Sequence, residues 1–276
     1  MSYSLDIVQC YGITKDLETN NFMMVMQYAD CGSLRQHLNN NFNSLSWESK
    51  LWNLYRITKG LKEIHNNQLV HRDFHSGNIL CHDIGDLRSL ISDLGLCKPA
   101  NVKPPQGGNR KIYGVLPYVA PEVLRGGEYT QASDIYGIGI IAYEVCTGLP
   151  PYHDIAHDEF LAAKICQGLR PKSNYKIPQL ILDIVKQCWD ADPLKRPNVK
   201  ELVNLVNELY NASYVNDSII YKQINEAKKV NKKLPLLSTG ILSYTTHTQA
   251  IYTSRLLDFK NLPEPKMLDN DNSFGN

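Results

Sequence analysis

The sequence predicts an α+β fold that is mostly helical, with a β-hairpin near its amino-terminal end. Two short apolar runs, residues 8–13 and 22–27, flank a polar and turn-prone stretch, a pattern typical of a β-hairpin. Between residues 46 and 211, apolar side chains recur at helical spacing in several successive segments. A few short apolar runs with polar loops interrupt this helical part, which makes a purely helical fold the poorer description.

The first two helices have clear start signals. Ser33 is suited to cap a short helix through Leu38, and Ser46 to cap a longer helix that ends at His65. Apolar residues of the longer helix share one face: Leu51, Leu54, Leu61 and Ile64.

The third helix, Ala132 to Thr147, is the most apolar segment, and we expect it to be buried. Gly148 and the two prolines that follow it should end this helix. Its apolar core is too short to span a bilayer. Further helices are expected at about 158–167, 178–189 and 197–211.

The helical pattern ends after Asn211. Residues 212–276 contain a lysine-rich patch and two Leu-Pro steps, so we expect a mostly disordered tail with one short helix near residues 219–230. A solvated surface is the simplest interpretation of these lysines, and a docking segment for other proteins or a membrane-surface role is the alternative.

Composition narrows the possible partners and compartment. The net charge is only +1, so no nucleic-acid partner is expected. The seven cysteines are scattered and never spaced C-x-x-C, which favours reduced thiols. The first residues lack a secretory signal pattern. We therefore expect a cytoplasmic protein.

Three acceptor side chains, Asp73, Asn78 and Asp93, lie on loops between short apolar runs. Two carboxylates and an amide at this spacing can converge on one phosphate-bound divalent cation. Oxygen ligands of this kind suit Mg²⁺, and phosphoryl transfer also requires a carboxylate to orient the attacking hydroxyl.

These residues stand in the motifs H-R-D-F-H-S-G-N, residues 71–78, and D-L-G, residues 93–95. The motifs resemble the catalytic loop and the start of the activation segment of eukaryotic protein kinases. Their sequences are most similar to those of the tyrosine-kinase-like group. The resemblance extends over residues 5–210. Further matching motifs follow in the family's order: A-P-E at 120–122, S-D-I-Y-G at 133–137, and the block from Cys188-Trp189 to Arg196-Pro197.

The resemblance implies a protein kinase-like fold with a mostly helical large lobe and a truncated small-lobe hairpin. It implies a small-lobe remnant at 1–30, a large lobe at 31–211 and a tail at 212–276. It also implies ATP and Mg²⁺ as cofactors, a protein substrate and a role in signal transduction.

Residue roles follow from the same resemblance. Asp73 would be the catalytic aspartate, and Asn78 and Asp93 would hold the metal. The adenine site would include Met26, Gln27, Ala29 and Leu80. Outside the site, Asp134 would brace the catalytic loop, and Arg196 would pair with Glu122.

Parts of the family's site are missing from this sequence. Its Gly-rich phosphate loop, strand-3 lysine and helix-C glutamate precede the point at which Leu5 aligns. The single G-x-G-x-x-A match, Gly137 to Ala142, lies within an apolar helix and is interpreted as a packing motif. Two interpretations remain open: a fragment of a complete kinase, with the activity of this chain alone in doubt, or an inactive pseudokinase that acts as a scaffold.

The sequence predicts less clearly which type of residue receives the phosphate. Most members of the tyrosine-kinase-like group phosphorylate serine or threonine, so we expect a Ser/Thr kinase. His75 and Val115, however, stand where many Ser/Thr kinases have lysine and threonine. Dual or tyrosine specificity therefore stays open.

Overall fold

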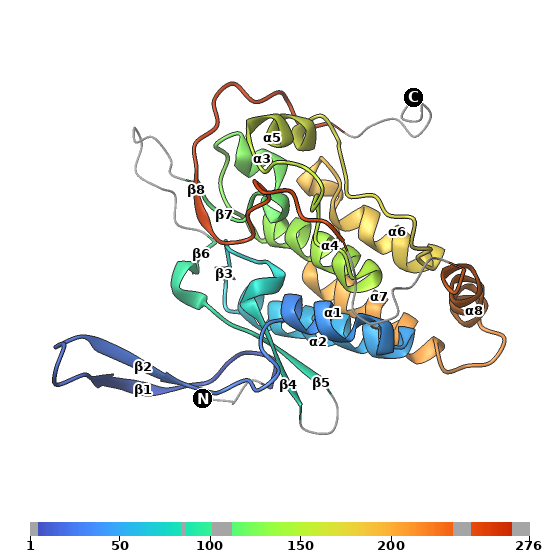
Figure 1. Ribbon diagram of the computed structural model, residues 1–276, viewed down its shortest axis with the longest axis horizontal. Helices are drawn as coiled ribbons and strands as arrows, with labels where there is room; N and C mark the ends of the chain where they lie inside the picture. Colours follow the sequence, from blue (N-terminus) through green and yellow to red (C-terminus); the bar gives the residue numbers. More distant parts are fainter. Residues whose placement is uncertain (1–4, 84–86, 101–111, 234–243, 267–276) are drawn as a thin grey trace.

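The computed structural model describes residues 5–83, 87–100, 112–233 and 244–266. Figure 1 shows a helical body from which one β-hairpin projects, while the carboxy-terminal segment runs across the face of the body.

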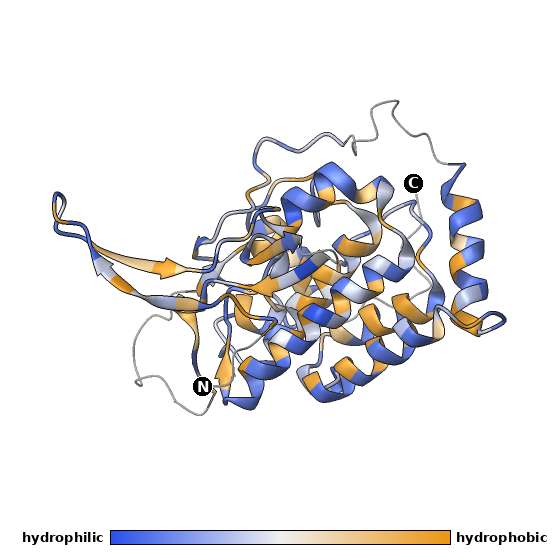
Figure 2. Cartoon of the chain, turned by 90° about the horizontal axis from the view of Figure 1, so that it is seen from below, coloured by the Kyte–Doolittle hydropathy of each residue, from blue (hydrophilic) through white to orange (hydrophobic). Residues whose placement is uncertain are grey.

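The projecting hairpin consists of β1 (Cys10–Lys15) and β2 (Phe22–Met26), paired antiparallel with Lys15 opposite Phe22. The predicted hairpin is therefore confirmed. All side chains of both strands are exposed, and apolar residues lie along both strands in Figure 2. The hairpin thus contributes nothing to the core.

Two capped helices follow. Ser33 caps α1 (Leu34–Asn41) in a capping box with Gln36, and Ser46 caps α2 (Trp47–Asn66) by accepting the Ser49 N–H. Both predicted caps are confirmed. The apolar face of α2 packs against α4 and α7.

Short strands carry the loops of interest. β3 (Leu69–Val70) pairs with β6 (Lys98–Pro99), and β4 (Ile79–Asp83) pairs with β5 (Leu87–Ile91). The turn between β3 and β4 contains the motif at residues 71–78. The segment after β5 contains Asp93.

Helix α4 (Gln131–Thr147) forms the centre of the body, and every residue from Ser133 to Thr147 is buried. Gly148, at φ 74°, ends it as predicted. The surrounding helices are α3 (Pro121–Leu124), α5 (Glu159–Cys166), α6 (Gln179–Cys188) and α7 (Val199–Ala212). Across the described ranges, no helix has the length and apolar content needed to cross a bilayer.

The glycines of α4 permit close packing. A Cβ on Gly137 would lie 2.9 Å from the Phe74 carbonyl oxygen, and a Cβ on Gly139 would lie 2.8 Å from Cys188 Cβ. The loop at residues 71–78 and α6 therefore approach the helix at these two positions. The interpretation of this segment as a packing motif is confirmed.

The prediction of a mostly disordered tail is wrong for the part that the structure describes. Helix α8 (Ile219–Asn231) includes the predicted short helix and buries Ile220, Ile224 and Ala227. Residues 244–266 lie against the helical body, and β8 (Arg255–Leu257) pairs with β7 (Ile112–Gly114). Contacts with residues far away in the sequence, rather than a local pattern, hold this segment in place.

Candidate active site

Asp134 holds the loop that carries Asp73. The Asp134 carboxylate, 2% exposed at residue level, accepts the backbone N–H of His71 at 2.8 Å and that of Arg72 at 3.1 Å. Its Oδ2 also lies 3.0 Å from His65 Nε2. Because α4 supplies this acceptor from the centre of the body, the loop is fixed to the most buried helix of the described fold. The bracing role expected for Asp134 agrees with this geometry.

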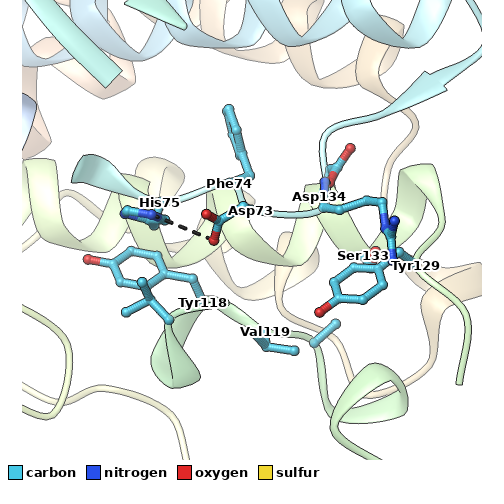
Figure 3. A pocket seen from close by; sticks show the side chains of 11 residues that line it. Asp73, Phe74, His75, Tyr118, Val119, Tyr129, Ser133 and Asp134 are labelled. Carbon is cyan, nitrogen blue, oxygen red and sulfur yellow. Dashed lines mark hydrogen bonds and ion pairs between the residues drawn. The ribbon is translucent and has the colours of Figure 1, made fainter. Parts of the chain in front are cut away.

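The Asp73 side chain is buried but not fully partnered. Asn78 Nδ2 donates to the Asp73 carbonyl at 2.9 Å and to Oδ2 at 3.3 Å. Asp73 Oδ1 accepts no ordinary hydrogen bond among the described residues, and His75 Nε2 lies 3.6 Å from it. Figure 3 shows Asp73 and His75 side by side in the lining of a small cavity, with a dashed line marking their contact. One carboxylate oxygen thus has no ordinary hydrogen bond and only the longer contact with His75.

Asp73 is ionised at neutral pH. Burial acts to raise the pKa of its carboxyl, but the neighbouring His75, together with Ser254 and His71, lowers the net pKa below the ordinary value. An ionised carboxylate with an oxygen that makes no ordinary hydrogen bond can orient an attacking hydroxyl and take up its proton.

His75 is positioned as a partner of Asp73 rather than as a surface cation. Its Nδ1 accepts the Gly77 N–H at 3.1 Å, so a neutral ring carries its proton on Nε2, the atom that faces Asp73. The ring is 6% exposed and lies 5.8 Å from the Tyr118 ring. His75 therefore does not reproduce the exposed lysine charge that many Ser/Thr kinases place there.

Asn78 and Asp93 are brought together by Ser92. The Ser92 N–H and hydroxyl both donate to the Asn78 carbonyl, at 2.8 and 2.9 Å. Asp93 follows in the left-handed conformation, at φ 55°, and is exposed. Because Asn78 uses its Nδ2 as a donor to Asp73, its Oδ1 remains available as a ligand.

These residues fit a divalent cation bound together with phosphate. Among the described residues, no group of three or more His, Cys, Asp or Glu side chains could hold a metal alone. One amide and one carboxylate oxygen are instead what Mg²⁺ uses when substrate phosphates and waters complete its octahedron.

The residues expected around adenine come from the end of β2, the segment that follows it, and β4. Met26, 41% exposed, ends β2, and the Gln27 N–H donates to the Gln9 carbonyl at 2.8 Å. The segment after half-buried Ala29 is joined to β4 by a bridge between Ser33 and Leu80. Their roles with adenine remain predictions.

A second buried network supports the same loop and was missed in the sequence. Glu144, 0% exposed, accepts hydrogen bonds from the Ser76 hydroxyl at 2.9 Å, the Tyr118 hydroxyl at 2.7 Å and the guanidinium of Arg35. It lies within an apolar stretch of α4, so only the three-dimensional arrangement reveals its partners.

The pair expected outside the site is present. Arg196 donates two hydrogen bonds to Glu122, at 2.7 and 2.8 Å. This bidentate pair joins α3, which contains Glu122, to the loop before α7.

The sequence also missed Ser254. This residue directly precedes β8, and its side chain is among the groups that lower the pKa of Asp73. The interpretation of the tail as disordered gave no reason to place any of its residues beside the loop.

The fold and the arrangement of Asp73, Asn78 and Asp93 are those expected of a protein kinase domain. A sequence model of the family described as protein tyrosine and serine/threonine kinase matches residues 2–206. The chain belongs to this family, which confirms the predicted family and the kinase-like fold with a mostly helical large lobe and a small-lobe hairpin.

Curated relatives agree with this assignment. A probable serine/threonine-protein kinase of Dictyostelium discoideum is 29% identical over 239 residues, 80% of this chain and 13% of that protein. The probable serine/threonine-protein kinase roco5 of the same organism is 34% identical over 192 residues, 63% of this chain and 6% of its own length. Serine/threonine/tyrosine-protein kinase HT1 of Arabidopsis thaliana is 27% identical over 189 residues, 68% of this chain and 47% of its own. The chain therefore spans less than half of each of these relatives.

Proposed function

We propose that this chain carries the large-lobe part of the active site of a Ser/Thr protein kinase. Such an enzyme transfers the γ-phosphate of ATP to a protein hydroxyl. The buried Asp73 Oδ1, which makes no ordinary hydrogen bond and lies 3.6 Å from His75 Nε2, is the observation that carries the proposal. Asp73 orients the acceptor hydroxyl, and Asn78 and Asp93 hold Mg²⁺. Bound there, Mg²⁺ neutralises the charge of the transferring phosphate.

The protein's own contribution is mainly positioning. Asp134 fixes the backbone of the loop, Asn78 orients the Asp73 carboxylate, and Ser92 places Asp93 beside Asn78. Such positioning accounts for much of the catalysis of phosphoryl transfer, because little covalent chemistry is required of the protein.

A transfer assay tests this function. The full chain is mixed with Mg²⁺, γ-labelled ATP and an array of peptides that carry a single Ser, Thr or Tyr. We expect label on Ser or Thr peptides, and a loss of at least about a hundredfold in Asp73→Asn, because the general base is removed. Asp217→Asn, at an exposed site far along the chain, should transfer normally. Undiminished transfer by Asp73→Asn would refute the proposal.

The second candidate function is a non-catalytic scaffold. Its supporting observation is that the hairpin presents exposed apolar residues such as Ile13, 71% exposed, and Phe22, 77% exposed. Calorimetric titration with ATP and Mg²⁺ separates the two functions. Micromolar binding by this chain favours the kinase, whereas no binding at millimolar nucleotide favours the scaffold.

We also propose a cytoplasmic location and signalling partners. All seven cysteines lie in the described residues, and none of them forms a disulfide. Burial raises the pKa of Cys81, Cys146 and Cys188 to about 12, so these thiols are protonated and unreactive. This thiol content suits a reducing compartment.

A further inference from the structure

Residues 244–266, the last part of the tail that the structure describes, cross the face of the molecule on which Asp73 lies. It begins near α1, where the Tyr244 hydroxyl donates to Asn39 Oδ1 at 2.8 Å. It ends beside α5, where the Lys266 N–H donates to the Cys166 carbonyl at 2.9 Å. Figure 1 shows this segment running over the helical body, with β8 beside β7.

His157 anchors the tail before it reaches the loop. The His157 N–H donates to the Gln249 carbonyl at 3.0 Å, and its Nδ1 lies 2.9 Å from the Ile251 carbonyl oxygen. The Tyr252 ring packs edge-on against His157 at 4.9 Å, and its hydroxyl donates to the Pro151 carbonyl at 2.9 Å. The backbone of residues 249–252 is thus fixed by several independent contacts.

The strand pairing anchors the tail on the other side of Ser254. Gly114 pairs with Arg255, and Ile112 pairs with Leu257, which is 3% exposed and belongs to the main core. Arg255 also donates to the His157 carbonyl. The backbone is therefore held by contacts on both sides of Ser254.

Gly114 places this ladder against the catalytic loop. A Cβ built on Gly114 would lie 3.7 Å from Asp73 Oδ1, the oxygen without an ordinary hydrogen bond. Ser254 is the residue next to Gly114's strand partner, Arg255. Its side chain approaches Asp73 closely enough to help stabilise the carboxylate, although the residue as a whole remains exposed.

We propose that residues 249–257 occupy the groove for the acceptor peptide, with Ser254 in the place of the acceptor hydroxyl, so that the tail is a substrate of this chain's own Asp73. This inference rests on the proposed kinase function. In the transfer, a bond forms between Ser254 Oγ and the γ-phosphorus of ATP, and the bond from that phosphorus to the β,γ-bridging oxygen breaks. The Ser254 proton passes to Asp73, and ADP leaves.

The same geometry selects the class of acceptor. β7 lies against Asp73 at Gly114, and the neighbouring strand brings the short Ser254 side chain to the carboxylate. The hydroxyl that reaches the carboxylate is thus one attached close to the backbone, as in serine or threonine. The groove therefore favours Ser/Thr acceptors. While the tail is bound, it competes with other protein substrates.

Phosphate mapping on the full chain tests the assignment. With Mg²⁺ and ATP, we expect phosphate on Ser254 at a first-order rate that does not change when the protein is diluted tenfold, because acceptor and catalyst belong to one chain. Ser254→Ala should remove this phosphate, and Thr253→Ala, at the exposed neighbouring residue, should retain it. Phosphate on added Ser peptides but none on Ser254 would overturn the inference and leave the kinase function standing.

A second pair of variants tests occupancy of the groove without relying on transfer. Leu257→Asp removes the buried anchor, whereas Leu256→Asp changes its exposed neighbour, which is 46% exposed. Leu257→Asp alone should speed amide hydrogen exchange at residues 112–114 by at least about tenfold, and it should lower the KM of a Ser peptide with little change in kcat. Exchange in the wild type as fast as in Leu257→Asp overturns the inference. If neither the peptide nor Ser254 gains phosphate, the kinase proposal fails for this chain. The exchange result then still decides whether residues 249–257 occupy the groove.

Discussion

The carboxylate of Asp134 accepts the backbone N–H of His71 at a distance of 2.8 Å. This bond connects the central helix to the residue that opens the catalytic loop, two positions before Asp73. The position of the Asp73 carboxylate is therefore set by the centre of the core rather than by the loop itself.

Replacing Asp134 by Asn should displace the loop. An amide offers one acceptor oxygen, and its NH₂ group would face the Arg72 N–H, which now donates to Asp134 Oδ1. An unsatisfied buried donor costs about 1–3 kcal/mol, and a shift of about 1 Å in Asp73 costs about a hundredfold in rate. Peptide phosphorylation and urea unfolding measure the two effects. Wild-type kcat in Asp134→Asn would contradict the bracing role.

Alanine at Gly137 should impair the site more than alanine at Gly139. The new Cβ at 137 would meet the Phe74 carbonyl at 2.9 Å, whereas the one at 139 would meet Cys188 on α6. Overpacking costs about 1–3 kcal/mol at either position. Only Gly137→Ala presses on the catalytic loop, so it should lower kcat strongly while Gly139→Ala mainly lowers stability. Equal kcat values in two variants of similar stability would disprove this distinction.

Breaking the pair between Glu122 and Arg196 from one side should be costly. The Arg196 side chain is 0% exposed, so Glu122→Gln leaves a buried guanidinium without its counter-charge. The expected loss is about 3–5 kcal/mol, measured by denaturant unfolding. The double variant Glu122→Gln with Arg196→Met should recover part of it. As a control, Asp217→Asn breaks an exposed ion pair with Lys222 and should change stability by less than about 0.5 kcal/mol. A similarly small loss in Glu122→Gln would contradict the prediction.

Lys50 should make stability depend on pH above neutrality. Its side chain is enclosed, with Nζ 3.7 Å from the centre of the Phe42 ring, and burial lowers its pKa from 10.5 to about 7. Between pH 7 and 10.5 the unfolded lysine is protonated and the folded one is largely neutral. The unfolded state then binds more protons, so stability rises with pH in this window.

The Lys50→Met variant tests this directly. The rise in the free energy of unfolding due to Lys50 should not exceed about 1.4 kcal/mol per pH unit, and Lys50→Met should lack it. Lys195→Met removes an exposed lysine and should keep the wild-type slope. Identical slopes for the wild type and Lys50→Met between pH 7 and 9 would show that Lys50 keeps an ordinary pKa in the fold.

Local signals in the sequence predicted much of the helical body. Ser33 and Ser46 precede helices that they cap, and the apolar run of α4 becomes the buried centre. Cap and burial signals are readable because the residues that decide them lie within a few positions of one another.

The tail could not be predicted in this way. β8 has three residues, and its partner strand lies more than a hundred positions earlier, so no periodic pattern marks it. Leu257 becomes a core residue only through this pairing. The partners of Glu144 are equally distant in the chain, since Arg35 comes from α1 and Ser76 from the catalytic loop.

The central claim is that Asp73, Asn78 and Asp93 form one site for a metal-bound nucleotide. Paramagnetic Mn²⁺ with ADP, added to the isotope-labelled protein, tests it by NMR even when binding is weak. Line broadening should centre on the amides around Asn78 and Asp93, and Asp93→Asn should abolish it while Asp217→Asn leaves it intact. Broadening that persists in Asp93→Asn, or that centres on another part of the molecule, would contradict the claim.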